Sequence, residues 1–106
     1  MNNKIKEAYE IRASILKALA HPTRLYIVDI LSSGEKNVGD LTELIKSDMS
    51  TVSKHLLILK NASIIEHTKR GVQVFYRLKM PCVLNFFGCI EKVLVERKSE
   101  LIKLNR

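Results

Sequence analysis

Residues 37–61 contain two short helical patterns separated by a tight polar turn, and this spacing restricts the fold more than any other feature of the chain. Asn37 is suited to cap the first helix, whose apolar face consists of Leu41, Leu44 and Ile45. The turn follows at residues 47–49, where Asp48 is suited to cap a second helix over residues 49–61. Two short helices joined by about three residues form a helix-turn-helix.

The second of these helices has two chemically different faces. At about 100° per residue, its apolar residues share one side and predict anchoring to the core, namely Val52, Leu56 and Leu59. Hydroxyl groups and a cation lie opposite, namely Ser50, Thr51 and Lys54, with Ser53 and His55 flanking them. Hydroxyls bond base edges or phosphates and lysine neutralises phosphate, so this face fits a DNA major groove. Taken alone, the same pattern also describes an ordinary solvated helix surface.

The remaining elements follow from periodicity and from turn residues. Helices are expected over residues 4–20 and 22–31, and a last helix is expected to begin at Pro81. Strand-forming residues around a glycine turn predict a β-hairpin with Lys69 and Arg70 at its tip. The expected fold is mainly α with a small β-hairpin, in the order of four helices, two strands and one helix. This is a winged helix-turn-helix in a single domain over residues 1–106.

Composition restricts the partners of the chain. Its 106 residues leave no room for a second catalytic domain, and 18 Lys and Arg against 11 Asp and Glu give a formal charge of +7. This balance favours a polyanion, and double-stranded DNA is the first candidate. A membrane surface is the weaker alternative, because the chain has no Trp to flank a cationic amphipathic helix.

Other function classes find no support in the sequence. No run of 18 apolar residues and no signal-peptide core occurs, so a cytoplasmic protein is expected. No glycine-rich phosphate loop, nucleophile motif or pair of catalytic carboxylates is present, so neither an enzyme nor a small-molecule substrate is expected.

Four segments in a fixed order carry a family resemblance. They are His21-Pro22-Thr23-Arg24-Leu25, Asn37-Val38-Gly39-Asp40-Leu41, Val52-Ser53-Lys54-His55-Leu56 with Leu59, and Val74-Phe75-Tyr76-Arg77-Leu78. In this order they resemble the start of the second helix, the third-helix segment, the recognition helix and the wing of the ArsR/SmtB repressors. The resemblance implies a homodimer that packs through its first and last helices, binds an imperfect inverted repeat and is released by an inducer.

The residues themselves support the dimer and mark one departure from the family. The last helix is apolar nearly all round between Val83 and Val95, more than one face of a small domain can bury, and an isologous helix pair would cover it. Ser63, which follows the recognition helix, stands where relatives usually have glycine. A left-handed backbone at this position would cost a residue with a Cβ about 1 kcal/mol.

The metal sites that the resemblance suggests are not expected here. Relatives that sense arsenic or cadmium often carry cysteine in the third-helix segment, where this chain has Asn37 and Gly39. The zinc-type site uses Asp, His and Glu on the last helix, and residues 79–106 contain no His. The three histidines, His21, His55 and His67, do not have metal-ligand spacing.

Cys82 and Cys89 are the candidate sensor thiols. Seven residues separate them by about 10.5 Å along a helix, so one chain can neither clamp an ion with both nor join them in a disulfide. In an antiparallel helix pair, Cys82 of one protomer can face Cys89 of its partner, where the thiols would take a soft metal or metalloid ion or an oxidant. The alternative is that both are small apolar residues of a dimer core.

Three functions therefore stay open from the sequence. The first is a repressor released through its thiols, and the second is a repressor without any small-molecule sensor. The third is a protein-interaction module that reuses the winged-helix fold.

Overall fold

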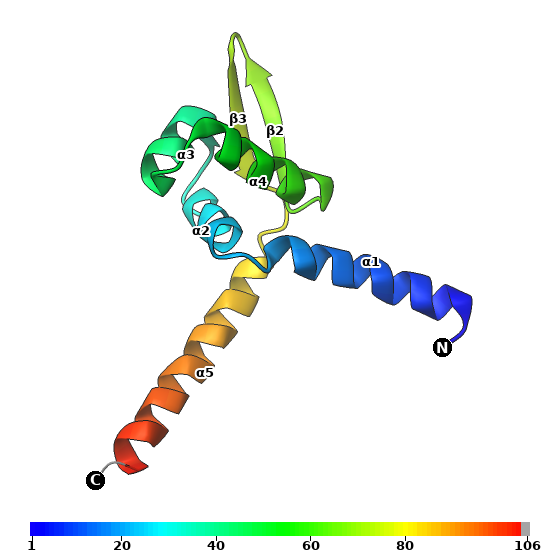
Figure 1. Ribbon diagram of the computed structural model, residues 1–106, viewed down its shortest axis with the longest axis vertical. Helices are drawn as coiled ribbons and strands as arrows, with labels where there is room; N and C mark the ends of the chain where they lie inside the picture. Colours follow the sequence, from blue (N-terminus) through cyan, green and yellow to red (C-terminus); the bar gives the residue numbers. More distant parts are fainter. Residues whose placement is uncertain (105–106) are drawn as a thin grey trace.

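The computed structural model describes residues 1–104 and contains a small helical core with a β-hairpin above it and two long terminal helices (Figure 1). Asn105 and Arg106, which the single-domain prediction includes, lie outside the described residues. The elements in chain order are α1 (Asn3–Leu19), α2 (Pro22–Leu31), β1 (Lys36–Asn37), α3 (Val38–Ile45), α4 (Met49–Asn61), β2 (Ile65–Arg70), β3 (Gln73–Leu78) and α5 (Val83–Leu104). The predicted winged helix-turn-helix and its order of helices are confirmed.

The sheet has one strand more than the sequence predicted. Its antiparallel order is β1-β3-β2, with Lys36 of β1 opposite Tyr76 of β3. β1 has only two residues, too few to produce any alternation of apolar and polar side chains that could be recognised in the sequence.

The hairpin, called the wing below, turns later than predicted. Lys69 and Arg70 do not form its tip, because they still pair with Val74 and Gln73 in the strand ladder. The turn is made by Gly71, with φ of 61°, and Val72, and two-residue hairpin turns commonly place glycine at such a positive-φ first position.

The start of the last helix is also later than predicted. Pro81 and Cys82 form a turn in which the backbone N–H groups of Leu84 and Asn85 donate to their carbonyls at 3.1 Å, a three-residue spacing, and α5 begins at Val83. The other predicted helices agree with the structure within about one residue at each end.

The core joins α2, α3, α4 and the base of the sheet. Its largest fully buried side chains are Ile27, Val28, Leu41, Val52, Leu56, Leu59, Ile64 and Ile65. Val52, Leu56 and Leu59 are each 0% exposed, which confirms the predicted inner face of α4. This anchoring fixes the direction in which the opposite face of α4 points.

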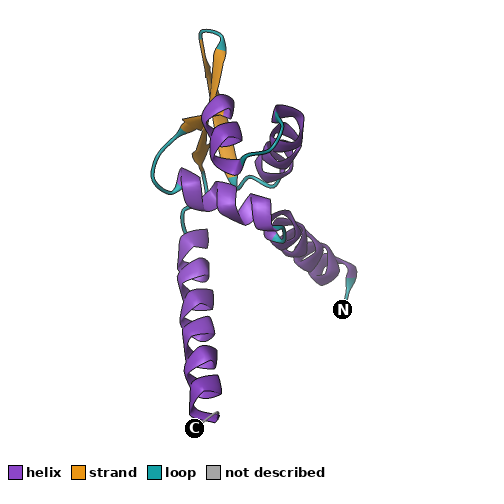
Figure 2. Ribbon diagram, turned by 60° about the vertical axis from the view of Figure 1, so that its left-hand side comes forward, coloured by secondary structure: helices purple, strands orange, loops and turns teal. Residues whose placement is uncertain are grey.

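The two terminal helices extend away from this core (Figures 1 and 2). α5 contacts the core near its start, where Val83 is buried and Leu84 and Phe87 are half-buried. The radius of gyration is 17.1 Å, whereas a compact chain of about 100 residues has about 13 Å. Among the described residues, large parts of α1 and α5 are exposed and have no packing partner.

Candidate nucleic-acid interface

The candidate interface begins at the first turn of α4, where Asp48 forms the N-cap. Its carboxylate accepts the backbone N–H of Thr51 at 3.3 Å, the Thr51 hydroxyl at 2.6 Å and the Ser50 hydroxyl. These hydrogen bonds from Ser50 and Thr51 lower the pKa of the Asp48 carboxyl to about 2. Asp48 is therefore ionised at neutral pH. The sequence had predicted the N-cap but not the hydrogen bonds that the two hydroxyls donate to it.

The outer face of α4 holds the predicted polar residues together. Ser50, Ser53 and Lys54 are exposed and Thr51 is half-buried, all on the side away from the buried anchors. Within residues 1–104, the ammonium group of Lys54 takes part in no ion pair. The face therefore offers hydroxyl oxygens and one unneutralised positive charge to a ligand.

His55 lies on a different side of α4, against the start of α2. Its Nδ1 is 3.3 Å from Nη1 of Arg24, and its ring centroid is 4.5 Å from that of His21. Since a guanidinium only donates, Nδ1 of His55 accepts and Nε2 carries the proton. Burial lowers the pKa of His55, and electrostatic interactions with the neighbouring His21 and Arg24 lower it further.

Arg24 connects this contact to α1. Its Nε donates to the carbonyl of Ala18, in the last turn of α1, at 2.6 Å. One guanidinium thus contacts both the C-terminal end of α1 and His55 of α4.

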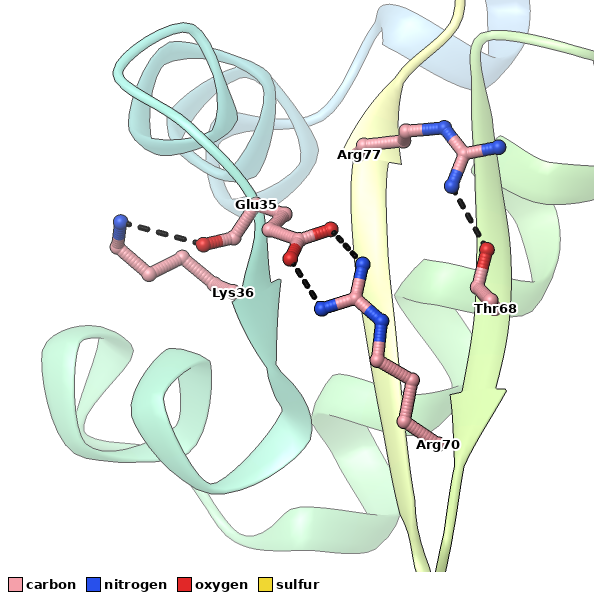
Figure 3. Close-up of polar contacts among 5 residues, drawn as sticks. All are labelled: Glu35, Lys36, Thr68, Arg70 and Arg77. Atoms are coloured by element: carbon pink, nitrogen blue, oxygen red, sulfur yellow. Dashed lines mark hydrogen bonds and ion pairs between the residues drawn. The ribbon is translucent and has the colours of Figure 1, made fainter.

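The wing is held to the body of the protein by an ion pair that sequence reasoning missed. Arg70 donates two hydrogen bonds to Glu35, in the loop before β1, at 2.5 and 2.9 Å (Figure 3). The guanidinium also lies 4.8 Å from the centre of the Phe75 ring. The hydrogen bonds from Arg70 lower the pKa of Glu35. Only proximity in the folded chain reveals this pair, since the two residues are 35 positions apart.

The two strands of the wing are joined by a second polar cluster. Arg77 donates to the carboxylate of Glu66 at 2.7 Å. It also donates to the hydroxyl of Thr68 at 2.7 Å (Figure 3). Lys69 is exposed and, in the described part of the chain, has no ion-pair partner. Of the two cations predicted for the wing, Lys69 is therefore available to an external phosphate, whereas Arg70 is already paired.

The candidate sensor thiols lie outside the helix-turn-helix and the wing. Cys82 is in the turn before α5 and Cys89 is within α5, and both are unbridged and exposed. No group of three or more His, Cys, Asp or Glu that could hold a metal ion occurs among residues 1–104. None of the helices in that range combines the length and apolar character needed to cross a bilayer.

Comparison with known proteins identifies the helix-turn-helix with a described family. The model of the family described as "Bacterial regulatory protein, arsR family" matches residues 21–67, which run from the cap of α2 into β2. A biofilm growth-associated repressor of Xylella fastidiosa is 41% identical over 73 residues, covering 69% of this chain and 63% of the relative. The transcriptional repressor SdpR of Bacillus subtilis is 35% identical over 65 residues, covering 61% of this chain and 72% of the relative. This chain thus spans less than two thirds of the length of the first of these relatives.

Solved structures agree in fold. The homodimeric winged helix-turn-helix DNA-binding domain of a possible ArsR-family regulator from Mycobacterium bovis has a TM-score of 0.80 at 26% identity, with 94% of this chain and 93% of that chain covered. The transcriptional repressor BigR of Xylella fastidiosa has a TM-score of 0.68 at 32% identity, with 85% and 92% covered.

Proposed function

This chain belongs to the ArsR family of bacterial regulatory proteins, and we propose that it represses transcription by binding DNA as a homodimer in the cytoplasm. One observation carries the proposal. α4 is fixed by three fully buried side chains, Val52, Leu56 and Leu59, so that its hydroxyl and lysine face is presented outward. The relatives named as repressors and the DNA-binding domain with the same fold support it.

In this function α4 is the recognition helix. Its first turn enters the major groove, where Ser50, Thr51 and Ser53 are within reach of base edges and Lys54 neutralises a phosphate. The wing lies beside the backbone or the minor groove, where Lys69 supplies a second positive charge. Arg70 contributes to DNA binding only where a phosphate replaces Glu35 as its ion-pair partner.

The exposed apolar stripes of the terminal helices support the homodimer. On α1, Ile5, Tyr9 and Leu16 lie within about 40° of one another and are all exposed. On α5, an exposed stripe spans about 100° and contains Phe86, Ile90, Val93, Leu94 and Leu101. Such surface is what an isologous interface covers.

A groove beside α5 continues that surface. It has a volume of about 470 Å³ and is lined by Leu25, Tyr26, Asp29, Phe87, Ile90 and Glu91. Its apolar lining lies between α2 and α5, so a second protomer that covers α5 also contacts α2, the helix that carries Arg24. Dimer packing would thereby help to fix the orientation of both recognition helices.

Selection from a randomised duplex pool at moderate salt, with reduced protein, tests the function. We expect an inverted repeat, with an affinity that falls steeply as salt rises, because several phosphates are neutralised on binding. A protein-interaction module would select no sequence, and that outcome would contradict the proposal.

We further propose that the thiols regulate release from DNA, since both sulfurs are exposed in the protomer and Cys89 lies beside the apolar stripe of α5. Across a dimer, Cys82 of one protomer and Cys89 of its partner would bind a soft metal or metalloid ion, or react with an oxidant. Titration of the DNA complex with arsenite, mercury, copper(I) or a persulfide donor tests this. Cys89→Ser should abolish release and leave affinity without inducer within about threefold. Unchanged release would contradict the sensor, and a complex that no agent dissociates would leave a repressor without one.

A further inference from the structure

The hydrogen bonds at the start of α4 have a defined polarity. Asp48 is ionised and can only accept, so the hydroxyls of Ser50 and Thr51 donate their protons to it. Each hydroxyl oxygen is left with its lone pairs for other partners. Two groups that could either donate or accept are thereby committed to one role.

The restriction of these two hydroxyls to accepting matters because the bases offer different hydrogen-bonding groups in the major groove. Adenine and cytosine present an exocyclic amino group there, whereas guanine and thymine present a carbonyl oxygen at the corresponding position. An accepting hydroxyl pairs with an amino group. To donate to a carbonyl instead, it would have to leave a charge-assisted bond to the carboxylate, which is stronger than a neutral one.

We propose, on the premise that α4 enters the major groove, that Asp48 is a specificity-determining positioning residue. It holds the Ser50 and Thr51 hydroxyls as acceptors, so that the first turn of α4 prefers adenine or cytosine and discriminates against guanine and thymine. Three donors of its own chain already occupy most of the roughly four acceptor sites of its carboxylate, so Asp48 acts mainly through the hydroxyls. Its negative charge also disfavours phosphates near this turn, so the turn contributes selectivity more than affinity.

The test combines two protein variants with duplexes that lack single amino groups. In the selected duplex, each adenine of a half-site is replaced in turn by purine, and each cytosine by 2-pyrimidinone. Asp48→Asn keeps a capping oxygen but adds an amino donor, and Asp48→Ser keeps a cap without any charge. Asp40→Asn is the matched control, since it removes the same charge from the first turn of α3.

For the wild type and Asp40→Asn, we expect that removing at least one exocyclic amino group from the duplex weakens binding by about fivefold. This factor is at the lower end of the discrimination that a specific base contact provides. For both Asp48 variants the same deletion should cost less than about twofold. Thermal unfolding of each variant verifies that the fold is kept.

The outcomes separate this inference from the function on which it rests. Equal losses for the wild type and both Asp48 variants, or no dependence of wild-type binding on any amino group, would overturn the role of Asp48 and leave the repressor intact. A pool that yields no sequence at all would overturn both.

Discussion

Ser63 offers a quantitative test of how the end of the recognition helix is built. Its φ is 61°, in the left-handed region, where a residue with a Cβ costs about 1–2 kcal/mol. Glycine at this position removes that cost but loses about 0.5–1 kcal/mol through the greater freedom of the unfolded chain. Ser63→Gly should therefore stabilise the protein by about 0.5–1 kcal/mol.

Ala62 supplies the matched control. It directly precedes Ser63 but has φ of −86°, which suits any residue, and it packs against the core. Ala62→Gly should therefore destabilise the protein by at least about 0.5 kcal/mol. Two glycine substitutions at neighbouring positions are expected to act in opposite directions.

Thermal unfolding by circular dichroism measures both variants. In a domain of this size, 1 kcal/mol shifts the Tm by about 4–8 °C, so a stabilisation of about 0.5–1 kcal/mol by Ser63→Gly should raise it by about 2–8 °C. All samples need equal concentration, because the Tm of a dimer depends on it. A Tm for Ser63→Gly at or below the wild type, with Ala62→Gly lowered, would refute the assignment of backbone strain to Ser63.

Three further predictions concern the wing, the helix junction and the thiols. Glu35→Gln should free the Arg70 guanidinium to bind a DNA phosphate, which raises the affinity for random-sequence DNA. Anisotropy titrations should then show a slope of log affinity against log salt concentration that is steeper by about one. An unchanged slope would contradict this prediction. The pKa of His55 is lowered from 6.5, so the unfolded state binds its proton more readily and stability falls as pH drops below 6.5. His55→Gln should flatten this part of the Tm against pH curve, and a difference that does not vary with pH would count against the reasoning. For Cys89→Ser, loss of inducer-driven release from DNA is expected, and the DNA titration with arsenite detects it.

The sequence sufficed for the features that local rules determine. Apolar residues at helical spacing placed the inner face of α4, and the caps Asn37 and Asp48 both accept backbone N–H groups as predicted. In each case the signal lies within a few residues of the feature.

Features that join distant segments could not be predicted in this way. Glu35 and Arg70 meet only because β1 pairs with β3, and β1 is too short to leave a pattern. His55 was predicted to flank the outer face, but its contact with Arg24 depends on how α2 crosses α4. Whether the predicted residues touch DNA stays a prediction; they are Ser50, Thr51, Ser53, Lys54, His55, Lys69 and Arg70.

The spacing of the half-sites tests the central claim most directly. A dimer with fixed recognition helices requires half-sites about one helical turn apart on the same face of the duplex. Affinity would be measured for the selected inverted repeat and for the same repeat with five extra base pairs at its centre, which place the half-sites on opposite faces. We predict that the insertion reduces binding to the level of random-sequence DNA. Equal affinity for the two duplexes would contradict a two-fold symmetric dimer that reads DNA through α4.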